Sequence, residues 1–476
     1  AEYVSMLSRP NDPYEVIEPK IELDDAQRIK AMGLEGVDYS PIQGRYYPEK
    51  NIGAHIMGFV GFVGDTKQGR YGLEGFFEKE LGGKAGEVNI ESTGKGETSS
   101  VSDKQTVIGE DGSDLILTIN RSVQYETCRL LGESVKKHGA SGGSVVIMDP
   151  KTGAILAMCA YPDYDPNNYR KVKDIDIYNN PVIFDQFEPG STFKAITVAA
   201  AVDQNKVGPN TTYKDTGFLM IEGWPKPISN SDYATRGAHG ITTINTVLQD
   251  SLNCGSIFAM QSIGPAVFSD YVKKFGFGEK TGIELETESS GNIANLTGKK
   301  IRPINAATAS FGQGISATPI QVAASYAVMA NGGMLVKPYL VKAVISPTGE
   351  QSLTQTTEIR RVIDKRTASL MTGMLVNAVE NGHASKAKVP GYYVAGKTGT
   401  AQVASKTSKG YEKGNTIQTF VGYAPANDPK FVMITRLDDP KDSKFAESSA
   451  VPLFGEIANF VLNYYQVPQE RKIEAK

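Results

Sequence analysis

The order of strand and helix patterns along the chain constrains its fold most. Two β-rich runs joined by a turn lie within residues 143–162, and three more lie within YYVAGKTGTAQV, QTFVGYAP and KFVMITRLDD near the C-terminus. Residues from about 190 to 390, between these runs, are rich in helix patterns. Strands from both ends around a helical insert predict one mixed antiparallel sheet, and therefore an α/β (α+β) fold.

Helix patterns adjoin these strands. A short strand pattern at residues 115–119 is followed by Asn120 or Ser122, either of which can cap a helix. The last helix is expected to bury one apolar stripe. That stripe comprises Phe454, Ile457, Val461 and Tyr464.

Composition divides the chain into three parts. Residues 1–114 are polar and rich in glycine and turn residues, which predicts an elongated, loop-rich module that is not a catalytic core. Residues 115–470 carry the patterns of a catalytic domain, and residues 471–476 form a polar tail.

The net charge of −3 gives no indication of nucleic-acid binding. No run of 18 apolar residues exists and the first residue is alanine, so we expect a processed or truncated chain whose membrane anchor was removed.

The cysteines and histidines exclude several kinds of site. Cys128, Cys159 and Cys254 lie in apolar stretches without CxxC spacing, which argues against zinc and predicts three buried thiols in a protein that does not depend on disulfides. A GxSxG match at residues 139–143 precedes a strand instead of joining a strand to a helix, so it does not support a Ser-His-Asp site. We expect His239 to be a loop histidine.

The stretch EPGSTFKAITVAA, at residues 188–200, contains the candidate nucleophile. Ser191 follows Pro-Gly and is expected to open a helix that runs to about Gln204, which places Lys194 on the same face. A serine hydroxyl needs a base beside it, and a lysine can be that base if burial and the positive helix end lower its pKa. Free backbone N–H groups at the same helix end can face a developing oxyanion.

The SxxK spacing alone is weak evidence, because it occurs three more times. These copies lie in a glycine-rich stretch, inside a helix pattern and in a loop, and we interpret each as a solvated pair. They are Ser92/Lys95, Ser134/Lys137 and Ser385/Lys388.

Two further elements follow in order. SLN at Ser251–Asn253 ends a helix pattern. KTG occurs three times, but only the copy at Lys397–Gly399 continues a strand and is followed by Thr400. A strand there can present an ammonium group, hydroxyls and a backbone N–H along one side of a cleft. The ordered set predicts a serine acyl-transfer site.

The set STFK, SLN and KTGT resembles the motifs of the penicillin-binding proteins. Two stretches are similar to the N-terminal pedestal of class B members, namely RYYPEKNIGAHIMGFVG and YGLEGFFEKELGG. Three others are similar to the division-type branch of that class: FEPGSTFK, FGFGEKTGIELETESSG and TASFGQGISATPIQVAASYAVMANGG. The similarity covers nearly all of the chain after about residue 40. An elongation-type assignment stays open, although that branch often has another residue where Glu188 stands in this sequence. Leu252 departs from the usual SSN but leaves Ser251 and Asn253 in place.

The resemblance implies a peptidoglycan D,D-transpeptidase with the penicillin-binding transpeptidase fold, which is similar to that of serine β-lactamases. Ser191 would attack the D-Ala-D-Ala carbonyl of a stem peptide, and Lys194 would take the hydroxyl proton. Ser251 and Lys397 would form a proton path to the leaving amine. Which of the two lysines is uncharged stays open.

The resemblance also implies the substrate-binding residues. Asn253 would hold the peptide amide, and the motif Lys397, Thr398, Gly399 would bind the terminal carboxylate together with Thr400. Backbone N–H groups of the nucleophile and of Thr400 would form the oxyanion hole. No cofactor and no metal is expected.

Partners and location follow from the same resemblance. β-Lactam antibiotics would acylate the serine, and an N-terminal anchor would hold the catalytic domain on the extracytoplasmic side of the cell membrane. A SEDS-type glycosyltransferase and divisome proteins would be partners in septal wall synthesis. Two alternatives stay open: a D,D-carboxypeptidase or β-lactamase, in which water replaces the acceptor amine, and an acylated sensor or scaffold protein.

Overall fold

The computed structural model describes most of the chain. The described residues are 2–8, 15–18, 21, 23–39, 44–64, 66–84, 87–89, 105–107, 109–298, 300–404 and 410–472. The chain divides into two units, Ala1–Tyr46 and Tyr47–Lys476. In the first unit, the described helices are α1 (Glu2–Leu7) and α2 (Leu23–Ala31).

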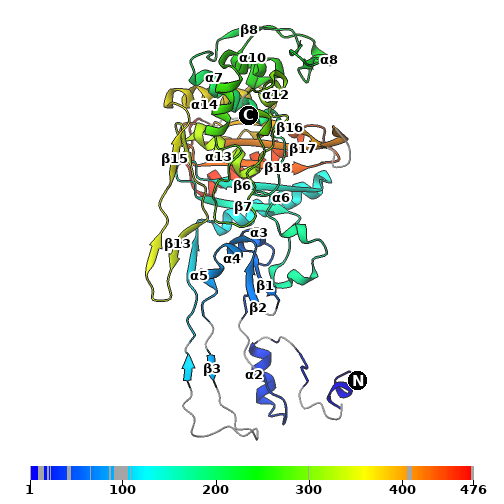
Figure 1. Cartoon of the computed structure of the whole chain (residues 1–476), viewed down its shortest axis with the longest axis vertical. Coiled ribbons are helices and arrows are strands. Elements are labelled where there is room, and N and C mark those ends of the chain that lie inside the picture. Colours follow the sequence, from blue (N-terminus) through cyan, green and yellow to red (C-terminus); the bar gives the residue numbers. More distant parts are fainter. Residues whose placement is uncertain are drawn as a thin grey trace. The chain divides into compact units, whose positions relative to one another are not determined.

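A five-stranded antiparallel sheet organises the second unit (Figure 1). Its strand order is β16-β17-β18-β6-β7. The strands are β6 (Gly142–Met148), β7 (Ile155–Tyr161), β16 (Ala395–Ala404), β17 (Tyr411–Ala424) and β18 (Phe431–Asp438). β18 pairs with β6, so the two ends of the catalytic region meet in the middle of the sheet. The predicted antiparallel sheet closed by N- and C-terminal segments is confirmed.

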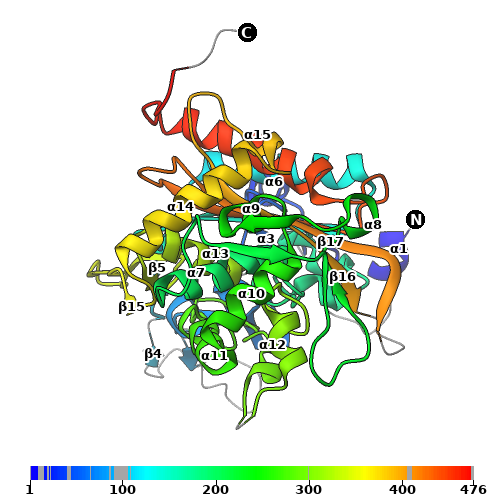
Figure 2. The ribbon, with the colours of Figure 1, turned by 90° about the horizontal axis from the view of Figure 1, so that it is seen from above.

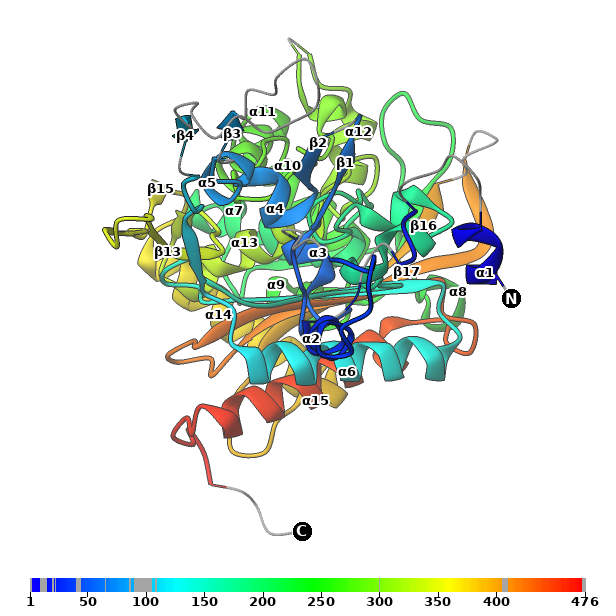
Figure 3. The same cartoon turned by 90° about the horizontal axis from the view of Figure 1, so that it is seen from below.

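The two faces of this sheet carry different helices. α6 (Arg121–His138) and α15 (Ala450–Tyr464) pack side by side on one face, whereas α7 (Lys194–Asp203) and α10 (Asn253–Ile263) lie on the other (Figures 2 and 3). Directly opposite residues of antiparallel strands share a face. Lys397 is opposite Val421, which is opposite Ile434, and both apolar residues belong to the core on the α7 side. The register therefore places Lys397 on the face that carries the candidate nucleophile.

The region between the two groups of strands is mainly helical, as predicted. Its other α-helices are α8 (Tyr233–Arg236), α9 (Ile244–Gln249), α11 (Pro265–Lys274), α12 (Pro303–Ala309), α13 (Pro319–Ala330) and α14 (Lys365–Glu380). Two short hairpin-like pairs precede α9. They are β8 (Thr212–Asp215) with β11 (Gly240–Thr243), and β9 (Phe218–Leu219) with β10 (Ile228–Ser229). Within the described part of the chain, every helix is too short or too polar to cross a membrane.

Smaller strand groups complete the unit. β12 (Met334–Val336) pairs with β15 (Glu358–Arg361), and β13 (Val341–Ile345) pairs with β14 (Gln351–Leu353) and β5 (Asp114–Leu117). The N-terminal part of the unit has short elements. They are α3 (Ala54–Met57), β1 (Phe59–Val63), β2 (Thr66–Arg70), α4 (Gly72–Phe76), α5 (Glu78–Leu81), β3 (Glu87–Asn89) and β4 (Gln105–Val107).

The N-terminal part of this unit packs on the catalytic part through aromatic rings. Phe59 stacks on Tyr169 with ring centroids 4.4 Å apart and meets Tyr178 edge to face at 4.8 Å. Each such pair contributes about 1 kcal/mol beyond the area it buries. The aromatic contacts therefore connect residues 47–84 firmly to the segment between β7 and α7.

The helix ends agree with the predictions in part. Asn120 caps α6, because its side chain accepts hydrogen bonds from the backbone N–H groups of Ser122 and Val123. In α15, the predicted stripe is buried except at Tyr464, which is 43% exposed. The prediction is wrong there because Tyr464 is the last residue of the helix and extends beyond the sheet-facing core.

The prediction of three free cysteines is also wrong. Cys128 in α6 and Cys159 in β7 form a disulfide, with their Cα atoms 5.3 Å apart. α6 packs across β7, and this packing brings together two positions that are 31 residues apart in the chain. Cys254 alone is a free, buried thiol, as predicted.

We expect removal of this disulfide to lower the free energy of unfolding without changing the chemistry of the site. A closed loop of this length stabilises a folded protein by about 3.7 kcal/mol, mainly by restricting the unfolded chain. The paired variant Cys128→Ala, Cys159→Ala should therefore unfold at lower guanidinium concentration than the oxidised wild type. The wild type treated with a reductant is the control and should shift in the same direction. Equal stability of oxidised and reduced protein would show that the disulfide does not stabilise the fold.

Candidate active site

Ser191 lies on a 3₁₀ turn, Gly190–Phe193, and the α-helix α7 begins only at Lys194. The sequence predicted a helix that opens at Ser191, so the predicted start is wrong by three residues. Two contacts tighten this turn: Thr192 Oγ1 donates to the carbonyl of Pro189 at 2.7 Å, and Gly190 N donates to the carbonyl of Gly312 at 3.1 Å. The approach requires glycine, because a Cβ at Gly312 would lie 2.2 Å from the Gly190 carbonyl oxygen.

The Lys194 amine joins the candidate nucleophile to the second motif. Its Nζ lies 3.0 Å from Ser191 Oγ and 3.1 Å from Ser251 Oγ, and it donates to the Ser251 carbonyl at 2.5 Å. The Lys194 side chain is 1% exposed. The two serines that were predicted to act together therefore contact the same buried amine.

Ser251 and Asn253 flank the turn between α9 and α10. Ser251 has a φ of 60°, in the left-handed region that a residue with a side chain seldom adopts. Asn253 is the first residue of α10, and its Nδ2 donates to the carbonyl of Ser229 at 2.8 Å. This backbone conformation directs both the carbonyl and the hydroxyl of Ser251 to Lys194.

The third motif lies on β16, beside the turn that carries Ser191. Lys397 is 2% exposed, and its Nζ lies 3.2 Å from Thr398 Oγ1. A Cβ at Gly399 would lie 2.4 Å from Thr419 Oγ1 and 2.9 Å from Cγ2 of Thr192. Glycine at this position therefore allows the strand to pack closely against the serine turn.

Thr400 completes the third motif at the next position of β16. Its Oγ1 accepts a hydrogen bond from the Ala446 backbone N–H at 3.3 Å. Thr400 therefore remains in ordered contact with the segment before α15, on the strand that borders the serine turn.

The two buried lysines of the site both have lowered pKa values. Burial, and then the positive charge of Lys397, hold the pKa of Lys194 well below its ordinary value. Burial lowers the pKa of Lys397 to about 8, and the carboxylates of Glu447 and Asp250 oppose this shift. Burial and the neighbouring Lys397 cation both disfavour the charged form of Lys194, which favours Lys194 as the uncharged amine of the pair.

Two of the other SxxK pairs lie among the described residues, and neither takes part in this arrangement. One lies within α6, and another lies at the short 3₁₀ turn Ser385–Ala387, where Lys388 Nζ donates to the Glu380 carbonyl at 2.8 Å. Ser92 and Lys95 lie outside the described residues. Among the described residues, no group of three or more His, Cys, Asp and Glu side chains is arranged to hold a metal ion.

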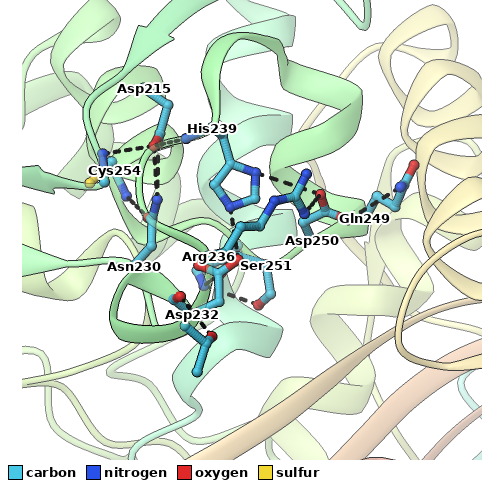
Figure 4. Close-up of polar contacts among 12 residues, drawn as sticks. Asp215, Asn230, Asp232, Arg236, His239, Gln249, Asp250, Ser251 and Cys254 are labelled. Carbon is cyan, nitrogen blue, oxygen red and sulfur yellow. Dashed lines mark hydrogen bonds and ion pairs between the residues drawn. The ribbon is translucent and has the colours of Figure 1, made fainter.

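The sequence indicated the position of His239 but not its contacts. The residue lies in the loop between α8 and β11, as predicted, yet its side chain is only 2% exposed. Its Nε2 lies 2.8 Å from Asp232 Oδ2, and its Nδ1 lies 3.8 Å from Asp250 Oδ2, next to Ser251 (Figure 4). A lone histidine has no spacing pattern, so the only available signal was its proximity in sequence to the SLN motif.

Comparison with known proteins agrees with this geometry. The family model for the penicillin-binding protein transpeptidase domain matches residues 143–459, and the model for the penicillin-binding protein dimerisation domain matches residues 5–117. The chain belongs to the penicillin-binding protein transpeptidase family. The predicted α/β fold and the predicted transpeptidase class are confirmed.

Relatives of this penicillin-binding protein support the class B, division-type assignment. Stage V sporulation protein D of Bacillus subtilis is 36% identical over 464 residues, which cover 96% of this chain and 70% of the relative. A peptidoglycan D,D-transpeptidase FtsI homolog of Mesostigma viride is 29% identical over 463 residues, which cover 93% of this chain and 76% of the relative. The crystal structure of penicillin-binding protein 3 of Mycobacterium tuberculosis with ampicillin superposes with a TM-score of 0.78 at 28% identity, covering 90% of this chain and 91% of that chain.

The charge of Lys397 predicts the alkaline limit of acylation. A lysine whose pKa is about 8 is protonated below that pH and loses its proton above it. If the Lys397 cation binds the carboxylate of a β-lactam, the rate of acylation by a fluorescent penicillin should fall as the pH rises through about 8. In Lys397→Arg, the guanidinium stays charged, so the fall should move to higher pH even if the maximal rate is lower. Stopped-flow measurements between pH 6 and 10 test this, and the same alkaline limb in both proteins would contradict it.

Proposed function

We propose that this penicillin-binding protein cross-links peptidoglycan by serine acyl transfer, with Ser191 as the nucleophile. The observation that carries the proposal is the 3.0 Å contact between Ser191 Oγ and the buried Nζ of Lys194. An uncharged amine at this distance can accept the hydroxyl proton as the serine attacks a carbonyl. No imidazole is needed for this step.

In the acylation step, Ser191 Oγ bonds to the carbonyl carbon of the penultimate D-alanine as its proton passes to Lys194 Nζ. The carbon–nitrogen bond to the terminal D-alanine then breaks, and the leaving amine takes a proton through Ser251 Oγ. The 3.1 Å contact between Lys194 Nζ and Ser251 Oγ supports this path. Lys397, as the neighbouring cation, favours return of the proton from Lys194 because like charges repel.

We assign substrate binding to the second and third motifs. Lys397 with Thr398 and Thr400 binds the terminal carboxylate, and Gly399 allows the strand to approach the serine turn. Asn253 holds the peptide amide of the donor. Backbone N–H groups of the nucleophile and of Thr400 form the oxyanion hole, where each donor stabilises the transition state by about 3 kcal/mol in comparable enzymes.

The acyl-enzyme is then attacked by the amine of a second stem peptide, which forms the cross-link and releases the serine. We further propose that residues 1–114 are a pedestal module, that residues 115–470 are the transpeptidase domain, and that residues 471–476 are a tail. An N-terminal anchor would place the domain on the outer side of the cell membrane. A SEDS-type glycosyltransferase and divisome proteins would supply and organise its glycan substrate.

The cellular setting has a second candidate. The Bacillus subtilis relative, at 36% identity, is named for stage V of sporulation. Wall synthesis during spore formation is therefore an alternative to synthesis at the division septum, with the same chemistry at Ser191.

We expect Ser191→Ala to abolish acylation while leaving the fold intact. Its side chain contributes the hydrogen bond to Lys194, and one such bond stabilises a protein by about 1 kcal/mol. Intact-mass spectrometry after addition of a penicillin should show one adduct on the wild type, on the tryptic peptide that contains Ser191, and none on the variant. Thermal unfolding of both proteins is the control for folding. An adduct on the folded variant would exclude Ser191 as the nucleophile.

The acceptor is tested with a synthetic stem peptide that ends in D-Ala-D-Ala, together with a second peptide that carries a free side-chain amine. A transpeptidase yields the amide-linked product, which mass spectrometry separates from the hydrolysed peptide. Hydrolysis alone would indicate a carboxypeptidase. A penicillin adduct without either product would indicate a sensor or scaffold protein.

A further inference from the structure

A cluster of polar side chains surrounds the buried imidazole of His239 beside the SLN motif (Figure 4). The imidazole lies between two carboxylates, with Nε2 2.8 Å from Asp232 Oδ2 and Nδ1 3.8 Å from Asp250 Oδ2. The Asp250 carboxylate also accepts a hydrogen bond from Gln249 Nε2 at 3.2 Å and forms an ion pair with Arg236 Nη1 at 3.4 Å. These contacts connect the loop after β10 to the residue that directly precedes Ser251.

The same loop is attached to the other side of the motif. Asn253 Nδ2 donates to the Ser229 carbonyl at 2.8 Å, and Cys254 N donates to Asn230 Oδ1 at 3.0 Å. The carboxylate of Asp215 fixes the loop internally, since it accepts from Asn230 Nδ2 at 3.0 Å and from the backbone N–H of His239 at 3.2 Å. The loop therefore holds the turn of Ser251 at both ends.

This turn needs external support, because Ser251 has a φ of 60°. A residue with a side chain in that conformation costs on the order of 1–3 kcal/mol and persists only where its surroundings over-determine it. The conformation directs the Ser251 carbonyl and hydroxyl to Lys194 Nζ, at 2.5 and 3.1 Å. A shift of Asp250 would release the backbone next to these two contacts.

We propose that His239 is a positioning residue for acylation, whose imidazole is hydrogen-bonded to Asp232 and lies against the carboxylate of Asp250, and so supports the turn that presents Ser251 to Lys194. This role rests on the proposed function of Ser191 and Lys194. The imidazole donates through Nε2 to Asp232 and faces the carboxylate of Asp250. It contacts neither the nucleophile nor the lysines, so it acts through Asp250 and the backbone of Ser251.

The two carboxylates also have an electrostatic effect on the lysines. Burial lowers the pKa of Lys194, and the charge of Asp232 opposes it. Burial likewise lowers the pKa of Lys397, and Glu447 and Asp250 oppose it. A histidine that is hydrogen-bonded to Asp232 and lies beside Asp250 therefore adjoins two of the charges that act on the two lysines.

The test compares acylation by a fluorescent penicillin in single variants of the full chain. We expect His239→Ala to lower the first-order acylation rate constant at least tenfold, with less than a threefold change in the concentration for half-saturation, because the turn and not the binding cleft is disturbed. His239→Gln should stay within about threefold of the wild type, because its amide can reach Asp232. His239→Asn has the same amide on a side chain one methylene shorter, and it should lose activity as the alanine variant does.

His138 provides a matched control. It is also a buried histidine, 6% exposed, with its Nδ1 2.8 Å from Asp442 Oδ1, but it ends α6 on the opposite face of the sheet. His138→Ala should lose stability to a similar degree while the folded protein keeps the wild-type acylation rate. Thermal unfolding of each variant identifies the temperature at which all are folded.

The outcomes separate the two proposals. A wild type that is not acylated refutes the proposed function itself. A wild type that reacts, with a folded His239→Ala variant that reacts equally fast, overturns only the role of His239. If His239→Ala does not fold, the pair His239→Gln and His239→Asn decides, since equal rates in these two variants would overturn the role and a slower asparagine variant would support it.

Discussion

The site depends on one buried amine. Lys194 lies inside the protein, where a full positive charge loses its hydration, and the second lysine of the site adds repulsion. An uncharged amine avoids both penalties and can act as a base. Three oxygen atoms of Ser191 and Ser251 surround the Lys194 nitrogen within 3.1 Å, so the proposed base is already in contact with the proposed nucleophile. Preorganisation of this kind reduces the reorganisation needed during the reaction.

The fold supplies this geometry from three distant segments. The serine turn packs closely against β16 because Gly399 leaves room for threonine atoms, and it packs against the backbone at Gly312 because that residue also lacks a Cβ. The sheet register then places Lys397 on the α7 side. The turn at Ser251 is fixed from outside by the loop that carries His239. The serine turn, β16 and the turn at Ser251 therefore each place one motif of the site.

Part of this could be predicted from the sequence. The three motifs were recognisable because each stands in a distinctive context, and the antiparallel sheet followed from β-rich runs at both ends of the helical region. The α-helix start was wrong because Gly190 N donates to the carbonyl of Gly312, a long-range contact that no local pattern encodes. The disulfide was missed because Cys128 and Cys159 meet only when α6 packs on β7. The burial of His239 likewise depends on a loop that folds back over the motif.

The charge of Lys194 is the central claim, and NMR can measure it directly. In protein labelled with ¹³C at the lysine ε carbon, the Lys194 signal can be assigned by its loss in Lys194→Met. If Lys194 is the base, this signal should have the chemical shift of an uncharged amine at pH 7, and burial beside Lys397 should make it titrate well below the ordinary value of 10.5. A signal that remains that of an ammonium group up to pH 10 would contradict the role of Lys194 as the base.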